Sequence, residues 1–65
     1  MIFAVNGSGY LLELHEDKIV TIWLCAEEGA IWSMVAKGLS EGEAFDMLRG
    51  KLGVESQYIP VTRVE

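Results

Sequence analysis

The sequence of 65 residues contains one cysteine, one histidine and one proline, and this scarcity excludes several classes of protein. The single cysteine, Cys25, cannot form an internal disulfide, so a disulfide-stapled secreted domain is excluded. One cysteine and one histidine also fall short of the ligand set of a structural zinc site. We therefore expect a protein of a reducing, cytoplasmic compartment.

Basic residues are also scarce. Five Lys or Arg stand against ten Asp or Glu, which gives a formal net charge of −5. A chain of this charge repels the phosphate backbone of DNA and RNA. The acidic residues are spread along the chain, which indicates a solvated surface and not a cation site. We expect no nucleic acid among the partners.

Long hydrophobic runs are absent. The first apolar run has no basic region before it, and no stretch approaches the roughly 18 apolar residues of a membrane span. We therefore expect no membrane partner. Even so, 51% of the residues are hydrophobic, which is more than a small monomer easily buries. The composition predicts a single domain over residues 1–65, covered in part by a homodimer contact or a peptide partner.

Three segments in the first half have the character of strands. Residues 2–6 end at an Asn-Gly-Ser-Gly turn, residues 10–16 follow, and residues 19–25 come after a tight turn at Asp17 and Lys18. The third segment is apolar on both faces, which predicts that it is covered on each side or paired with a partner.

The next residues have the period of a helix. Four apolar residues recur at the i, i+3 and i+4 spacing of one helical face: Ala30, Ile31, Met34 and Val35. The pattern predicts a helix over residues 26–37. Gly38 follows at the position that a left-handed residue takes after a helix.

A second helix is predicted after Gly38. Ser40 and Glu43 have the spacing of a capping box, which marks the start of a helix. The apolar stripe of this helix is formed by Ala44, Phe45, Leu48 and Leu52. Gly53 ends the helix, and Gly50 inside it indicates a close crossing with another element.

The C-terminal segment favours a strand. Pro60 excludes a long helix here, whereas the β-branched and aromatic residues of 58–64 favour a strand at a sheet edge. The fold class expected is α+β, as a small winged-helix-like domain. It has an N-terminal three-stranded antiparallel sheet, two helices and a short C-terminal strand.

Few residues could carry catalysis. His15 stands alone next to a turn, and Cys25 has no basic neighbour that would activate its thiol. Residues 6–9 lack the lysine and the following helix of a phosphate-binding loop. We therefore predict that the protein is not an enzyme and has no catalytic residue, no metal site and no cofactor.

Two predicted helices joined by a short corner also suggest a DNA-binding helix-turn-helix. The exposed residues of the second helix are Glu41, Glu43, Asp46, Arg49 and Lys51. Its acidic residues lie at the N-terminal end, which would enter the major groove, so a DNA-binding regulator is the less favoured alternative.

Residues 10–54 resemble the PqqD-like domains, also called RiPP recognition elements. The resemblance is carried by Gly29–Trp32 (GAIW), by Gly38 and Ser40 before the second helix, and by Leu52–Val54 (LGV). The third helix usual in that family has no counterpart in residues 55–65. The binding cleft is then absent, truncated or completed by a second copy of the chain.

This resemblance implies a non-catalytic module that presents a leader peptide to a modifying enzyme. The peptide would add as a strand to the third β-strand, with Ile19, Val20, Thr21, Ile22, Trp23 and Leu24 as the peptide-binding residues. The alternative from a different class is a small homodimeric structural or regulatory protein whose apolar surface is buried by its twin.

Overall fold

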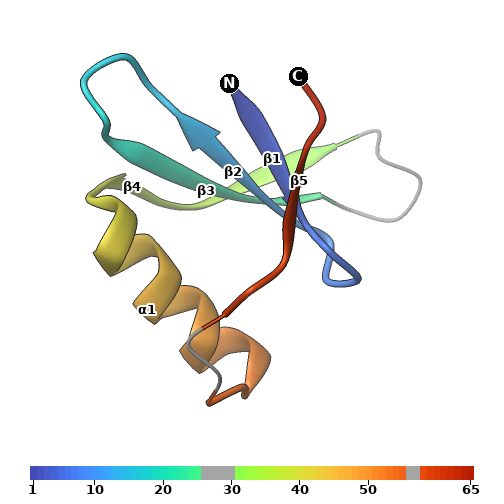
Figure 1. The fold of residues 1–65 in the computed structure, drawn as a ribbon. Helices are drawn as coiled ribbons and strands as arrows, with labels where there is room; N and C mark the ends of the chain where they lie inside the picture. Colours follow the sequence, from blue (N-terminus) through green and yellow to red (C-terminus); the bar gives the residue numbers. More distant parts are fainter. Residues whose placement is uncertain (26–30, 56–57) are drawn as a thin grey trace.

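The computed structural model describes residues 1–25, 31–55 and 58–65, which form an antiparallel sheet with a helix against one face (Figure 1). In chain order the elements are β1 (Ile2–Val5), β2 (Tyr10–Leu14), β3 (Val20–Cys25), β4 (Trp32–Leu39), α1 (Glu41–Leu52) and β5 (Val61–Arg63). The five strands lie in the order β4-β3-β2-β1-β5. Consecutive strands up to β4 are therefore neighbours, and β5 returns to the far edge beside β1.

The first three predicted strands are confirmed, and so are the turns between them. Gly7 and Gly9 have φ angles of 73° and 82° in the first turn, where a residue without Cβ adopts this conformation at no steric cost. In the second turn Lys18 takes a φ of 67°, and the Asp17 carboxylate accepts the N–H of Ile19 at 3.2 Å. Local turn chemistry thus fixes the register of β1, β2 and β3.

The predicted helix over residues 26–37 is wrong where the structure describes it, because residues 32–39 form strand β4. Residues 26–30 of that prediction lie outside the described residues. Eight residues of β4 lie against six residues of β3, so β4 carries extra residues at bulges. Val35 is extra at one bulge. Lys37 and Gly38 together face Thr21 at the other, where Gly38 has a φ of 72°.

These bulges explain why the sequence pattern of this segment resembles that of a helix. Each extra residue shifts the alternation of side chains by one position, so the apolar residues no longer recur with a period of two. Met34 and Val35 are therefore neighbours in an apolar pattern that has the i, i+3 and i+4 spacing of a helix. Trp32 and Val35 are strand-prone residue types, and β3 offers them a long partner.

The predicted fold class is consequently wrong. The described residues contain a sheet of five strands and one helix, in place of three strands, two helices and a short strand. A winged-helix-like domain needs the helix that β4 replaces. The helix-turn-helix alternative loses its first helix for the same reason.

The second predicted helix, α1, is confirmed with its capping box. The N–H of Glu43 donates to Ser40 Oγ at 3.2 Å, and the N–H of Ser40 donates to Glu43 Oε1 at 2.8 Å. At the other end Gly53 has a φ of 68° and donates its N–H to the carbonyl of Arg49. Arg49 also pairs with Asp46 one turn earlier. Local signals therefore define both ends of α1.

The core lies between α1 and the sheet. The side chains of Ile22, Ala44 and Leu48 are fully buried there. The buried cluster is formed by Val5, Leu12, Val20, Ile22, Ala44, Leu48 and Ile59. Because Ile59 belongs to it, the connection between α1 and β5 also closes the core.

Strand β5 confirms the predicted C-terminal strand at a sheet edge. It pairs with β1, with Val61 opposite Val5 and Arg63 opposite Phe3. Beyond the strand, the N–H of Ile2 donates to the carbonyl of Glu65 at 2.8 Å. The two chain ends therefore lie side by side (Figure 1).

Gly50 gives a direct test of the account of α1. The predicted close crossing at this residue is wrong, because a Cβ built there meets nothing within 4 Å. We expect Gly50→Ala to raise the free energy of unfolding by up to about 1 kcal/mol, since alanine loses less backbone entropy in a helix. Urea unfolding followed by circular dichroism measures this. Gly53→Ala is the matched control and should destabilise, because its φ of 68° disfavours a side chain.

The capping box predicts a pH dependence of stability. The hydrogen bonds from the Ser40 backbone and then from its side chain lower the pKa of Glu43 below its ordinary 4.5. A lowered pKa in the folded state adds stability that is present above pH 4.5 and lost as the pH falls through the folded pKa.

We therefore expect Ser40→Ala to cost about 1 kcal/mol near neutral pH, from the loss of the N-cap. The difference from the parent chain should shrink as the pH falls below the ordinary pKa of Glu43. Thermal unfolding at a series of pH values measures it. The variant keeps the backbone N–H of residue 40, so a difference that does not change with pH would show that the Ser40 side chain does not contribute to the lowered pKa of Glu43.

Candidate interaction surface

The residues predicted to bind a peptide, Ile19–Leu24, do not form a free edge. Strand β3 pairs with β2 on one side and with β4 on the other. Ile19, just before the strand, donates its N–H to Asp17 and accepts the N–H of His15. The backbone groups that would receive an added strand are therefore already paired within the sheet.

The side chains of the same segment are divided between the two faces of the sheet. Val20 and Ile22 belong to the core under α1. Thr21 and Trp23 point to the opposite face, because successive residues of a strand alternate. This division explains why β3 is apolar on both faces.

The face opposite α1 carries an apolar row that crosses the sheet. The register places one residue from each strand side by side: Thr62, Ala4, Leu11, Trp23 and Met34. Directly paired residues of antiparallel strands share a face, so the row is continuous. Trp32 lies on the same face, two residues from Met34. We call Ala4, Leu11, Trp23, Trp32 and Met34 the open apolar face; no described helix covers it (Figure 1).

The two tryptophans anchor this face on the side of β4. Their ring centroids are 5.9 Å apart and the ring planes are inclined by 56°, a tilted arrangement that aromatic pairs favour. Trp23 also donates its indole N–H to Glu13 Oε1 at 3.0 Å. Trp23 is half-buried, whereas Trp32 is 41% exposed and Met34 is 52% exposed. The most accessible apolar side chains therefore lie on β4.

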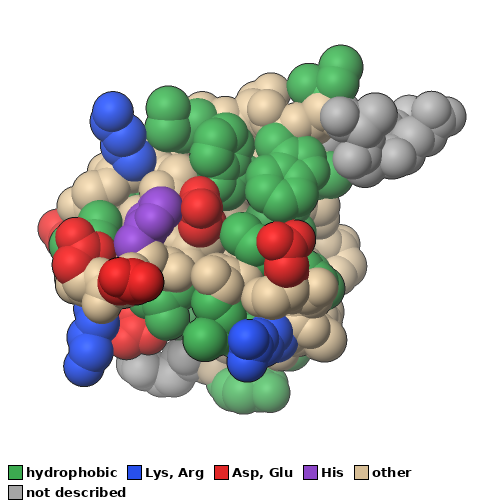
Figure 2. Space-filling model, turned by 90° about the horizontal axis from the view of Figure 1, so that it is seen from above, with side chains coloured by type: hydrophobic (Ala, Val, Ile, Leu, Met, Phe, Trp, Pro, Cys, Tyr) green, Lys and Arg blue, Asp and Glu red, His purple; other side chains and the backbone are tan. Residues whose placement is uncertain are grey.

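A polar group borders the open apolar face. His15 Nε2 lies 3.0 Å from Thr21 Oγ1 and 3.8 Å from Glu13 Oε1. Glu13 thus stands between the indole of Trp23 and the imidazole. Figure 2 looks onto this side of the molecule and shows hydrophobic side chains gathered next to acidic and histidine side chains. This side of the sheet is therefore amphipathic, with Glu13 and His15 beside the apolar row.

Strand β4 is the accessible edge of the sheet beside these side chains. It pairs with β3 on one side, and no described strand pairs with it on the other. Trp32, Ser33 and Met34 run in regular register with β3, whereas the bulges twist the remainder of the strand. Bulges and a charged residue such as Lys37 are the usual protection of an edge. The regular part, Trp32–Met34, lacks that protection.

Sequence reasoning missed β4 as an interaction strand because it read these residues as a helix. The signal that could have found it is the apolar composition of the third strand, which is typical of a central strand with a neighbour at each edge.

Cys25 lies on the same face as these side chains, because it pairs directly with Trp32. Cys25 is a free, partly buried thiol at the end of β3. Within the described residues, no group of three or more His, Cys, Asp or Glu side chains could hold a metal ion. In the same part of the chain, no helix has the length and apolar character to cross a bilayer.

Comparison of the chain with models of protein families, with curated proteins and with solved structures gives no match. The resemblance to PqqD-like domains is therefore not supported by a relative, and the winged-helix-like fold that it implies differs from the fold observed.

Proposed function

We propose that the chain is a non-catalytic polypeptide-binding module that holds an extended segment of a partner along the outer edge of β4. The observation that carries the proposal is the edge itself. Strand β4 has eight residues and is paired on one side only among the described residues. An added strand would gain main-chain hydrogen bonds along the regular part of this edge, Trp32–Met34.

The side chains next to the edge support this function. Trp32 and Met34 lie on one face at an interval of two residues, and both are about half exposed. Side chains of an added strand alternate with the same interval, so apolar residues of the partner would contact them. Aromatic residues and methionine are enriched at the centres of interfaces.

The charge of the chain favours a basic partner. The net charge is −5, and Glu13 borders the open apolar face. Complementary charge speeds association and excludes acidic competitors. A segment that alternates apolar and basic residues is therefore the preferred ligand.

Presentation of a leader peptide to a modifying enzyme is one use of such an edge, and it remains a prediction of the resemblance. The pairing of β3 on both sides favours β4 over residues 19–24 as the docking strand. The homodimer alternative would use the same edge in two copies, but the shared net charge opposes that contact.

Selection from a phage-displayed library of random peptides of about ten residues tests the proposal. We expect net positive, alternating peptides to be enriched and to shift the amide signals of residues 32–39 in NMR titrations. Met34→Lys should weaken the binding of these peptides by about tenfold, because it places a positive charge on the contact surface.

The matched control is Thr62→Lys, which adds the same charge to the same row at the opposite edge of the sheet. It should leave peptide affinity unchanged. Enriched peptides that bind the Met34→Lys variant as tightly as the parent chain would overturn the proposal. A chain that captures no peptide and sediments as a dimer would favour the homodimer in its place.

A further inference from the structure

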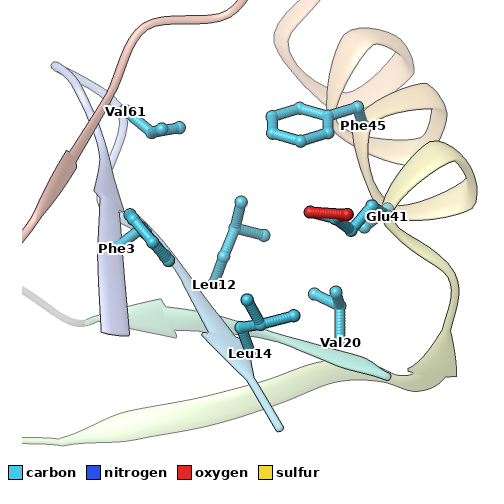
Figure 3. Close-up of a pocket in the computed structure, with 8 residues that line it drawn as sticks. Phe3, Leu12, Leu14, Val20, Glu41, Phe45 and Val61 are labelled. Carbon is cyan, nitrogen blue, oxygen red and sulfur yellow. The ribbon is translucent and has the colours of Figure 1, made fainter. Parts of the chain in front are cut away.

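A second candidate site lies on the other side of the sheet. An apolar cavity of about 230 Å³ opens between α1 and the strands (Figure 3). Its lining comes from β1, β2, β3, α1 and β5 and consists of Phe3, Leu12, Leu14, Val20, Glu41, Ala44, Phe45 and Val61. Seven of these eight side chains are apolar, and the eighth is a carboxylate.

The cavity follows from the position of α1. The helix starts two residues after β4 and packs mainly against β3 and β4. The helix-facing side chains of β1 and β2, such as Phe3 and Leu14, are therefore only partly covered. The small side chain of Ala44 leaves further room where α1 faces the sheet. The cavity thus forms because α1 covers β3 and β4 more fully than β1 and β2.

Glu41 is the polar group of this cavity. Its carboxylate points from the first turn of α1 into the space between Phe45, Leu12 and Val20 (Figure 3). Other carboxylates of α1 are engaged, since Glu43 bonds to Ser40 and Asp46 pairs with Arg49. Glu41 forms no hydrogen bond or ion pair within the described residues. No Lys, Arg or His lines the cavity to compete for it.

We propose that this cavity binds a small amphipathic cation, namely a primary ammonium compound that carries one aromatic ring or a short branched alkyl group. The ring fills the apolar part between Phe3, Leu12 and Phe45. The ammonium group donates to the Glu41 carboxylate at the mouth. Apolar walls with one placed charged group are the usual composition of small-molecule sites.

The volume sets the size of the ligand. A dry apolar cavity of about 150 Å³ is known to hold benzene in another protein. The cavity here, at about 230 Å³, therefore has room for one ring and a linker of a few atoms. Sites for drug-sized molecules begin near 300 Å³, above this volume. A single ring with a short linker is thus the ligand that matches the cavity best.

Titration with 2-phenylethylammonium chloride, followed by NMR of the full chain, tests this proposal. We expect saturable shifts at the amides of Leu12, Leu14, Glu41 and Phe45. The neutral analogue 2-phenylethanol should bind roughly five- to tenfold more weakly, because it lacks the charge that pairs with Glu41. The anion 3-phenylpropanoate should bind more weakly still.

Two variants separate the contribution of Glu41 from that of the apolar walls. Glu41→Gln should remove the preference for the ammonium compound over the neutral analogue. Glu43→Gln is the matched control, because it removes the same charge two residues away, from a carboxylate that accepts a hydrogen bond from Ser40. This variant should keep the preference for the ammonium compound. Val61→Phe should weaken both ligands by filling the cavity.

Equal binding of the three ligands, or a preference that survives Glu41→Gln, would overturn the proposal. So would the absence of saturable shifts at the cavity residues. The site lies on the face of the sheet that bears α1, whereas the proposed polypeptide site lies at the outer edge of β4. Shifts in the two titrations fall on different residues, so either site can fail without the other.

Discussion

The backbone pairing between β3 and β4 is the interaction on which the rest of the structure depends. It provides hydrogen-bond partners for the backbone at the second edge of β3, and it makes β3 an inner strand of the five-stranded sheet. It also places Leu39 opposite Val20, so that Ser40 begins α1 directly above the core. This position of α1 brings Ala44 and Leu48 into the same buried cluster as Ile22. The same pairing leaves the outer side of β4 as an edge.

A single helix cannot cover a sheet of this width, and two apolar regions of the described residues are left partly uncovered as a result. One is the open apolar face, which has no described helix above it and carries Trp32 and Met34. The other is the cavity beside α1, where Glu41 lies among apolar side chains. A domain of this length buries only about 60% of the surface of its unfolded chain. Exposed apolar side chains that gather on one surface are typical of sites that bind other molecules.

Much of the local structure could be predicted from the sequence, because it depends on local chemistry. The turn at residues 6–9, the capping box of Ser40 and the C-terminal Gly53 each act within a few residues, and each was found. Strand β4 could not be found by the same method, because its bulges give apolar residues the spacing of a helix. The candidate sites could not be predicted from the sequence for a related reason. The cavity joins side chains from five elements, and the edge of β4 exists only once the strand order is known.

Amide hydrogen exchange and NOE patterns of residues 31–39 test the central claim most directly. Pairing of β4 with β3 predicts contacts between Trp32 and Cys25 and between Met34 and Trp23, together with amides that alternate between protected and rapidly exchanging along Trp32–Met34. The amides that exchange rapidly would be those on the free edge, and the bulges would interrupt the pattern beyond Met34. Sequential amide–amide contacts of a helix over residues 31–37, or uniform protection of β4 in dilute solution, would contradict the account.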